Sequence, residues 1–173
     1  IEGFTITNGY AKNGGGMWND YSSPTLNDCT FTSNYAAFGG GMSNDNNSST
    51  LTNCTFTNNS ATFAGGMGSY NSSNPTLTDC TFTGNTATYN GGGMCNFGST
   101  PTLIDCTFTN NTASNGGGMR NSNNAHPTLT NCTITYNTAS NGGGISNNHH
   151  DGNCALINST VCGNSPNQIN GPY

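Results

Sequence analysis

The side chains of this sequence that can do acid–base chemistry are few, and most of the carboxylates occupy repeated positions. The chain has 173 residues, of which seven are Asp or Glu, two are Lys or Arg and three are His. Asp79 and Asp105 each directly precede a Cys-Thr-Phe-Thr segment. Two carboxylates held about 5 Å apart can hydrolyse a glycosidic bond with retention. Asn takes the same position in other segments, which favours a corner of the chain over catalysis. The six equivalent positions are Asp28, Asn53, Asp79, Asp105, Asn131 and Asn158.

The remaining reactive groups give no stronger indication of an enzyme. Lys12 and Arg120 are the two strong bases and lie in different segments, whereas a polysaccharide lyase needs a base beside clustered acids. His149, His150 and Asp151 form a cluster that could hold a metal weakly, and a solvated loop is the simpler interpretation. No two cysteines have the Cys-x-x-Cys spacing of zinc sites. We therefore predict a protein that is not an enzyme and that binds no cofactor or metal.

The elements that position these residues come from an internal repeat. Cys-Thr-Phe-Thr occurs at residues 29–32, 54–57, 80–83 and 106–109, with variants at 4–7, 132–135 and 159–162. Successive copies are 25 to 27 residues apart. An aliphatic residue stands three before the Cys position, Asn stands five after it in most copies, and Ala stands seven after it. Gly-Gly-Gly-Met or a close variant follows. Each position of the unit therefore forms its own column.

These columns predict a stacked all-β fold. Thr-Leu-Thr and Cys-Thr-Phe-Thr alternate with period two, which is typical of short strands with one buried face. One such strand cannot bury its apolar face alone, but identical coils stacked on each other can. The sequence predicts a parallel β-solenoid of about seven coils of 25–27 residues. Residues 1–173 form one domain, expected to be a segment or subunit of a longer rod.

The composition excludes two classes of partner. Charged residues make up only 5% of the chain, and the formal net charge is −5. Without a basic patch the protein cannot neutralise phosphates, so nucleic acid is not expected as a partner. No run approaches 18 apolar residues, so no membrane span is expected.

The repeat resembles a known family. Phe-x-x-Asn, as in Phe31/Asn34 and Phe82/Asn85, followed by Gly-Gly-Gly-Met is similar to the repeat of polymorphic outer membrane proteins. The wider resemblance is to right-handed parallel β-helix proteins of bacterial surfaces. It departs from that repeat in having Gly-Met in place of Ala-aliphatic. The resemblance implies a right-handed coil and an extracellular or cell-surface rod, structural or adhesive, without a fixed enzymatic activity.

Eight cysteines are present, five of them in the inward column, where they are expected to be buried free thiols. Parallel Cβ vectors on stacked strands are poorly placed for disulfides. Cys154 and Cys162 lie in the last, irregular coil and could form a local disulfide. Cys95 follows an inward Met94 and is expected to point outward, as an unpaired thiol or an intermolecular link.

Threonines flank the inward aromatic or aliphatic residue of the Cys-Thr-Phe-Thr strand in six of the copies. Stacked Thr-x-Thr strands form a regular lattice of methyl and hydroxyl groups. This resembles the ice-binding face of insect β-solenoid antifreeze proteins, so ice is an alternative partner, although Thr is also a good outward strand residue. The lattice consists of Thr5, Thr7, Thr30, Thr32, Thr55, Thr57, Thr81, Thr83, Thr107, Thr109, Thr133 and Thr135. A second file contains Thr50, Thr52, Thr76, Thr78, Thr128 and Thr130.

Two further surface features favour an extracellular rod. Asn-x-Ser/Thr sequons are dense, and they predict a glycoprotein if the source glycosylates. The candidate acceptors are Asn46, Asn47, Asn53, Asn58, Asn71, Asn110, Asn131 and Asn158. Exposed aromatics could bind glycans, which gives a polysaccharide-binding module as a third interpretation. These aromatics are Trp18, Tyr21, Tyr70 and Phe97, and packing at strand edges is the simpler reading.

The coil ends carry no evident cap. Unpaired strand edges invite another chain, so we expect copies to stack head to tail, which would build a filament.

Overall fold

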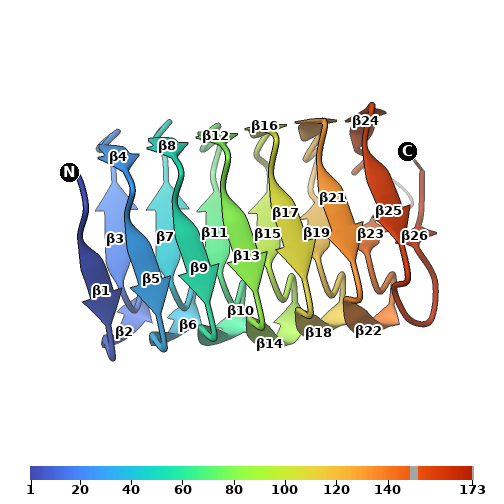
Figure 1. Ribbon diagram of the computed structural model, residues 1–173, viewed down its shortest axis with the longest axis horizontal. Coiled ribbons are helices and arrows are strands. Elements are labelled where there is room, and N and C mark those ends of the chain that lie inside the picture. The colour runs from blue at the N-terminus through green and yellow to red at the C-terminus, as the bar shows by residue number, and fades with distance from the viewer. Residues whose placement is uncertain (149–151, 173) are drawn as a thin grey trace.

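The computed structural model describes residues 1–148 and 152–172 and contains only β-strands and connecting turns within them. Strands of successive coils pair in parallel and in register, as in Ile6↔Phe31 and Leu26↔Leu51. The strands build four sheets that run along one axis (Figure 1). Within the described residues no helix is long and apolar enough to span a membrane.

Each sheet takes one strand from each coil, and we number the sheets by the order in which the chain visits them. Sheet 1 contains β1 (Thr5–Thr7), β5 (Thr30–Thr32), β9 (Thr55–Thr57), β13 (Thr81–Thr83), β17 (Thr107–Thr109), β21 (Thr133–Thr135) and β25 (Thr160–Cys162). Sheet 2 contains β2 (Tyr10–Asn13), β6 (Tyr35–Phe38), β10 (Ser60–Phe63), β14 (Thr86–Asn90), β18 (Thr112–Asn115) and β22 (Thr138–Asn141). Sheet 3 contains β3 (Met17–Asp20), β7 (Met42–Asp45), β11 (Met67–Tyr70), β15 (Met94–Phe97), β19 (Met119–Ser122), β23 (Ile145–Asn147) and β26 (Ile169–Asn170). Sheet 4 contains β4 (Thr25–Asn27), β8 (Thr50–Thr52), β12 (Thr76–Thr78), β16 (Thr102–Ile104), β20 (Thr128–Thr130) and β24 (Ala155–Ile157).

The parallel β-solenoid predicted from the repeat is therefore confirmed, with about six turns where about seven coils were expected. Six full sets of four strands run from β1 to β24. After β24 the chain adds β25, a single bridge at Thr138↔Ser165 and β26. The last repeat therefore extends sheets 1 and 3 but does not complete a coil in the described residues.

The core consists of the inward columns that the repeat predicts. Phe31, Phe56, Phe82 and Phe108 are fully buried, and their rings stack with centroids 4.5 to 4.8 Å apart and nearly parallel planes. Leu, Cys and Met columns complete the same apolar cluster. Each coil contributes one ring, and successive rings are separated by the spacing of paired strands. A chain with few apolar residues can therefore form a continuous core. The Met column fills the core beside the stacked rings.

The corners depend on residues that tolerate a left-handed backbone. The six Asp and Asn residues directly before the Cys position of the repeat, from Asp28 to Asn158, have φ between 51° and 55°. Asn and Asp adopt this conformation more readily than most residues. Asp79 and Asp105 are therefore corner residues, as expected from their exchange with Asn.

A buried ladder of Asn side chains fixes the corner between sheets 1 and 2. Each amide nitrogen donates to the side-chain oxygen of the next Asn at 2.9 to 3.0 Å and to a backbone carbonyl, such as that of Phe31. Gly9 donates its N–H to the first Asn, and Gln168 accepts from the last. The Asn column of the repeat therefore forms a continuous amide ladder. Its members are Asn34, Asn59, Asn85, Asn111, Asn137 and Asn164.

A second Asn ladder, on the inward side of sheet 3, is interrupted in the third coil. Asn19 donates to Asn44 at 2.8 Å, and Asn96 donates to Asn121 at 2.8 Å. Ser69 stands between these two halves, in register with Asn44 and Asn96. The Ser69 hydroxyl and the Asn96 side-chain oxygen are buried without a hydrogen-bond partner among the described residues. The serine is too short to continue the ladder.

Substituting Ser69→Asn should stabilise the protein, because the new amide can donate to Asn96 and accept from Asn44. Satisfying a buried polar group is worth about 1–3 kcal/mol, and we expect a gain of about 1–2 kcal/mol in the free energy of unfolding. Chemical denaturation followed by circular dichroism measures the change. Ser69→Ala is the control and should gain less, because Asn96 stays unpaired. A loss of stability in Ser69→Asn would show that the ladder cannot be closed there.

Candidate functional site

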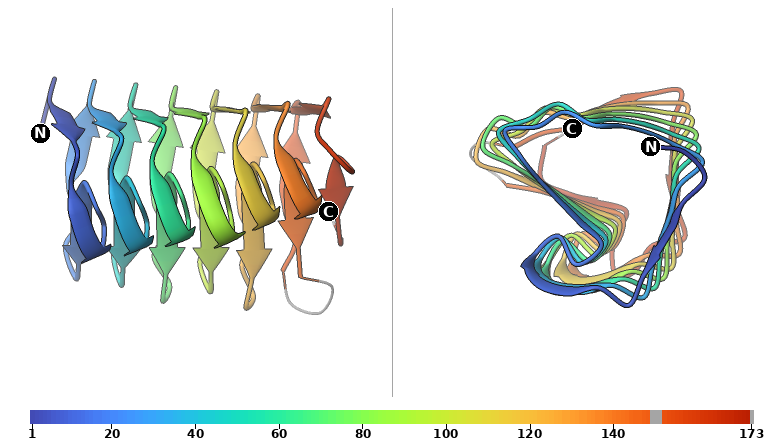
Figure 2. Two further views of the ribbon diagram at one scale, coloured as in Figure 1. Left: turned by 90° about the horizontal axis from the view of Figure 1, so that it is seen from below. Right: turned by 90° about the vertical axis from the view of Figure 1, so that its left-hand side faces the viewer.

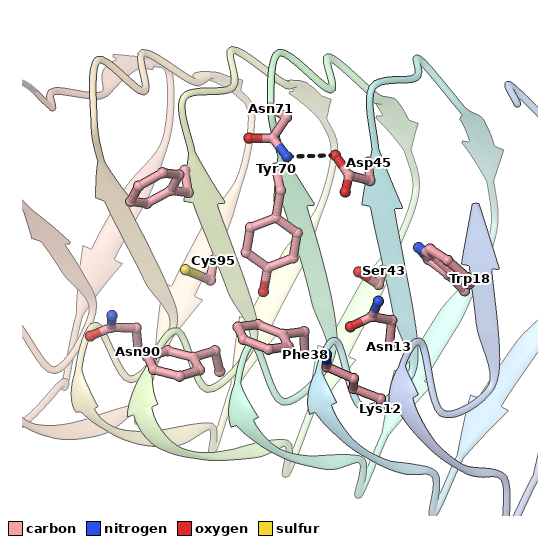
Figure 3. A pocket seen from close by; sticks show the side chains of 12 residues that line it. Lys12, Asn13, Trp18, Phe38, Ser43, Asp45, Tyr70, Asn71, Asn90 and Cys95 are labelled. Carbon is pink, nitrogen blue, oxygen red and sulfur yellow. Dashed lines mark hydrogen bonds between the residues drawn. The ribbon is translucent and has the colours of Figure 1, made fainter. Parts of the chain in front are cut away.

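The rod has a concave surface where sheet 2 meets sheet 3. Seen along the axis, the chain path turns inward between these sheets (Figure 2). Here a groove of about 450 Å³ crosses the first four coils. The aromatic groove, as we call it, is lined by Lys12, Asn13, Trp18, Phe38, Ser43, Asp45, Phe63, Tyr70, Asn71, Asn90, Cys95 and Phe97 (Figure 3).

The Gly runs make this inward turn possible. Gly39 has φ +66°, and a Cβ at Gly40 would come within 2.4 Å of the carbonyl oxygen of Gly65 in the next coil. Glycine is needed where one backbone approaches another this closely. Ala64 takes the position of Gly39 in the third coil, with φ 61°. The close stacking places the ends of the sheet 2 strands against the outward face of sheet 3.

The floor of the groove is the outward face of sheet 3. One row of in-register residues runs from Trp18 through Ser43 and Gly68 to Cys95. Trp18 is half exposed, whereas Ser43 and Cys95 are buried. Burial raises the pKa of the Cys95 thiol to about 12, against an opposing effect of the Arg120 charge. In this buried position the Cys95 thiol is therefore protonated at neutral pH.

The wall of the groove is a row of aromatic rings at the ends of the sheet 2 strands. Phe38 and Phe63 stack with ring centroids 5.3 Å apart, and Phe63 lies 5.3 Å from Tyr89. Tyr89 joins this row because β14 is one residue longer than β10, and the register shifts so that Phe63 pairs with Asn90. An added residue of this kind redirects a side chain.

Tyr70 lies across the floor of the groove. Gly68 has no side chain, and a Cβ built there would come 2.4 Å from Tyr70 Cε2 and 2.5 Å from its hydroxyl. The ring also meets Phe38 edge to face at 6.0 Å. The Tyr70 hydroxyl is buried and has no hydrogen-bond partner among the described residues. Burial, then the nearby Cys95 and Asp45, raise the pKa of Tyr70 well above its usual value of 10.

Polar groups occupy the rim. Asp45 Oδ1 accepts hydrogen bonds from Asn71 Nδ2 at 2.7 Å and from Asn46 Nδ2 at 2.9 Å. Lys12 contributes one positive charge at the sheet 2 side of the groove. An aromatic interior with a few polar groups around it is typical of sites for small or chain-like ligands.

The structure brings together three of the four aromatics considered for glycan binding. Trp18, Tyr70 and Phe97 line the groove, and Tyr21 does not. Sequence reasoning missed Phe38 and Phe63. The signal that could have identified them is an aromatic residue directly before the Gly run. The expectation that Cys95 is outward is correct for the strand face, but the thiol is buried by the groove around it. It is therefore not presented at the surface as an intermolecular link would require.

The predicted Thr lattice lies on sheet 1 as two in-register rows. One row runs from Thr5 to Thr133 and continues beyond the predicted lattice to Thr160, and the other runs from Thr7 to Thr135. The members are exposed or half exposed. The second file, on sheet 4, is less regular, because Ile104 interrupts one of its rows and Ala155 ends the other.

Seven of the eight candidate glycosylation positions are exposed, and all seven have a positive φ at corners of the rod. Asn47 is the exception. It is buried, and its amide nitrogen donates to the carbonyl oxygen of Asn19 at 2.9 Å. The Asn-x-Ser/Thr pattern does not reveal the burial of Asn47, because that burial comes from the turn between sheets 3 and 4. Asn47 is therefore not an accessible acceptor in the folded protein.

The two cysteines considered for a disulfide are both free thiols. Cys154 is buried, and Cys162 is exposed. Cys162 pairs in register with the outward Thr135, whereas Cys154 belongs to the core cluster, so the two residues have opposite environments. The column thiols are buried and free as expected, and Cys54 Sγ donates to the Thr52 carbonyl oxygen at 3.3 Å.

The other candidates for chemistry do not assemble into a site. Lys12 lies on β2 in the first coil, and Arg120 lies on β19 in the fifth, where it donates to the Ser146 hydroxyl at 2.7 Å. His149, His150 and Asp151 lie outside the described residues. Within the described part of the chain, no three His, Cys, Asp or Glu side chains are placed to hold a metal ion.

Comparison with known proteins gives a family match over most of the chain. A family model described as the right handed beta helix region matches residues 16–171. Searches of curated proteins and of solved structures found no match.

Proposed function

The chain belongs to the right-handed β-helix family, and we propose that it is an extracellular adhesive rod that binds neutral glycan chains in the aromatic groove. The observation that carries this proposal is the gathering of aromatic side chains from two sheets along one concave surface. Trp18 and Phe97 are 52% and 45% exposed, so their rings are accessible to a ligand. Large apolar groups exposed together on a polar surface mark binding sites.

A glycan fits the chemistry of this groove. Pyranose rings have apolar C–H faces and polar hydroxyl edges, which match aromatic rings on the floor and polar groups on the rim. The groove is elongated across successive coils, as a chain ligand requires. The net charge of −5 and the small number of basic residues disfavour polyanionic glycans. The ligand class supported best is therefore neutral.

Titration with a neutral oligosaccharide tests the proposal. Trp18 is the single tryptophan of the chain, and because it lines the groove its fluorescence should report binding directly. We expect cellohexaose or xylohexaose to change Trp18 emission saturably, and polygalacturonate to have little effect. Phe97→Ala should weaken binding about tenfold, which corresponds to about 1.4 kcal/mol for one aromatic contact.

Tyr21→Asn is the matched control, because Tyr21 is an exposed aromatic outside the groove, and Asn46, which follows the paired strand of the next coil, has the same left-handed backbone. Its affinity should equal that of the wild type. Equal losses in both variants, or no response to any neutral glycan, would contradict the proposed function.

Ice binding through sheet 1 is the second candidate, supported by the in-register Thr rows. We expect a protein that acts in this way to show thermal hysteresis and to lose it in Thr107→Tyr, since a bulky ring in the middle of the face disrupts its regularity. Thr76→Tyr, on the less regular second file of sheet 4, is the control and should retain the activity. An absence of hysteresis in the parent protein would remove this candidate.

A further inference from the structure

The floor of the aromatic groove contains a gap that one of the protein's own side chains fills. In the outward row of sheet 3, the strands on either side of Gly68 carry Ser43 and Cys95. The missing side chain at Gly68 leaves a slot between them, and the Tyr70 ring folds back from the same strand to occupy it. A Cβ at Gly68 would overlap that ring, at 2.4 to 2.6 Å from its outer atoms.

The Tyr70 ring fits this slot in shape but not in hydrogen bonding. Its ring packs edge to face against Phe38, yet its hydroxyl is buried without a partner among the described residues. A buried hydroxyl without a partner is unfavourable compared with the same group in water. Rotation of the side chain toward solvent would hydrate the hydroxyl and empty the slot. The closed position is therefore opposed by its own hydroxyl, which favours exchange of the ring with another ligand.

We propose that Tyr70 is a movable ring that occupies a subsite for one six-membered ring of the ligand, and that binding displaces it. The proposal rests on the proposed function for the identity of the ligand, a hydroxyl-bearing pyranose of a neutral glycan. Such a ring presents hydroxyls to the Ser43 hydroxyl and the Cys95 thiol, which flank Gly68. A ligand can bind only those molecules in which the ring has left the subsite. The apparent affinity is therefore the intrinsic affinity multiplied by the fraction of molecules with an open subsite.

Two substitutions of Tyr70 should then act in opposite directions. Tyr70→Phe keeps the ring and removes the unpaired hydroxyl, so the closed position becomes more stable. Affinity for cellohexaose, measured by Trp18 fluorescence, should fall about five- to tenfold. Tyr70→Ala removes the competing ring, and affinity should rise about tenfold. If Tyr70 only contacted the ligand, we would expect the reverse: a large loss of affinity in Tyr70→Ala and little change of affinity in Tyr70→Phe. That result would overturn the proposal.

Thiol labelling tests the movement of Tyr70 without any glycan. Cys95 is buried at the slot and becomes accessible when the ring leaves. In a Cys162→Ser background, which removes the exposed thiol, Cys95 modification by a maleimide should be several-fold slower in Tyr70→Phe and at least tenfold faster in Tyr70→Ala. Peptide mass spectrometry identifies the labelled cysteine, and the core thiol Cys106 must stay unlabelled in all variants. Labelling of both thiols would report unfolding.

The two readouts separate the two proposals. Equal Cys95 labelling rates in the wild type and in Tyr70→Phe, with Cys106 protected, would overturn the movement of Tyr70 whatever the ligand. The predicted order of labelling rates without any response of Trp18 to cellohexaose or xylohexaose would support the movement and overturn glycan binding.

Discussion

Substituting Gly92→Ala should destabilise the protein by at least about 3 kcal/mol. A Cβ at this position would come 2.4 Å from the carbonyl oxygen of Gly117 and 2.6 Å from that of Thr112. Both atoms belong to the backbone of the next coil, so a rotamer change cannot relieve the overlap. Overpacking against side chains costs about 1–3 kcal/mol, and displacement of a paired backbone costs more. The midpoint of chemical denaturation, followed by circular dichroism, measures the loss.

Gly98→Asn is the matched control. Gly98 has φ +61°, and the equivalent positions of the neighbouring coils are Asn71 and Asn123, which also have positive φ. We expect a change within about 0.5 kcal/mol, as at surface sites without special features. An unchanged midpoint for Gly92→Ala would contradict the close stacking of the Gly runs, and with it the inward turn that forms the groove.

The second large effect is expected for Asn85→Ala in the buried ladder. Asn85 Oδ1 accepts from the backbone N–H and the amide nitrogen of Asn59, both at 3.0 Å. Its own amide nitrogen donates to the Phe56 carbonyl oxygen at 2.9 Å and to Asn111 at 3.0 Å. Alanine removes all four bonds and leaves buried groups unpaired, at about 1–3 kcal/mol for each such group. We expect a loss of about 3–5 kcal/mol in the free energy of unfolding.

An Asn ladder that is only partly buried, at the end of sheet 2, gives the control for this substitution. Asn115 donates to Asn90 at 3.2 Å and accepts from Asn141 at 3.1 Å, with water able to replace both partners. Asn115→Ala should cost less than about 1 kcal/mol. Similar losses for Asn85→Ala and Asn115→Ala would mean that burial of the ladder does not determine its contribution.

The fold was predictable because every coil places the same residue types at the same positions. The Phe and Leu columns define the inward face, and a break in alternation at Asp28 and its equivalents marks a corner. The exchange of Asp with Asn at that corner also indicated a backbone role, which the positive φ at Asp79 and Asp105 confirms. Columns report what all coils share, so they predict the core and the turns well.

The groove was less predictable because its residues depart from the columns. Trp18 and Cys95 share one position with Ser43 and Gly68, so nothing repeats there except the outward direction. An outward position does not make Cys95 exposed, because the chain path is concave beside sheet 3. The contact of Tyr70 with Gly68 depends on a missing side chain, and Tyr89 reaches its row through a one-residue shift in register. Such local features need the spatial arrangement of two sheets.

Backbone chemical-shift mapping of the isotope-labelled protein tests the central claim most directly. On addition of cellohexaose or xylohexaose, we predict that perturbed amide signals cluster at the residues lining the aromatic groove, including Trp18, Ser43, Tyr70 and Phe97. The Thr rows of sheet 1, on a different side of the rod, should be unaffected. Perturbations confined to sheet 1, or none with any neutral oligosaccharide at millimolar concentration, would contradict a glycan-binding groove.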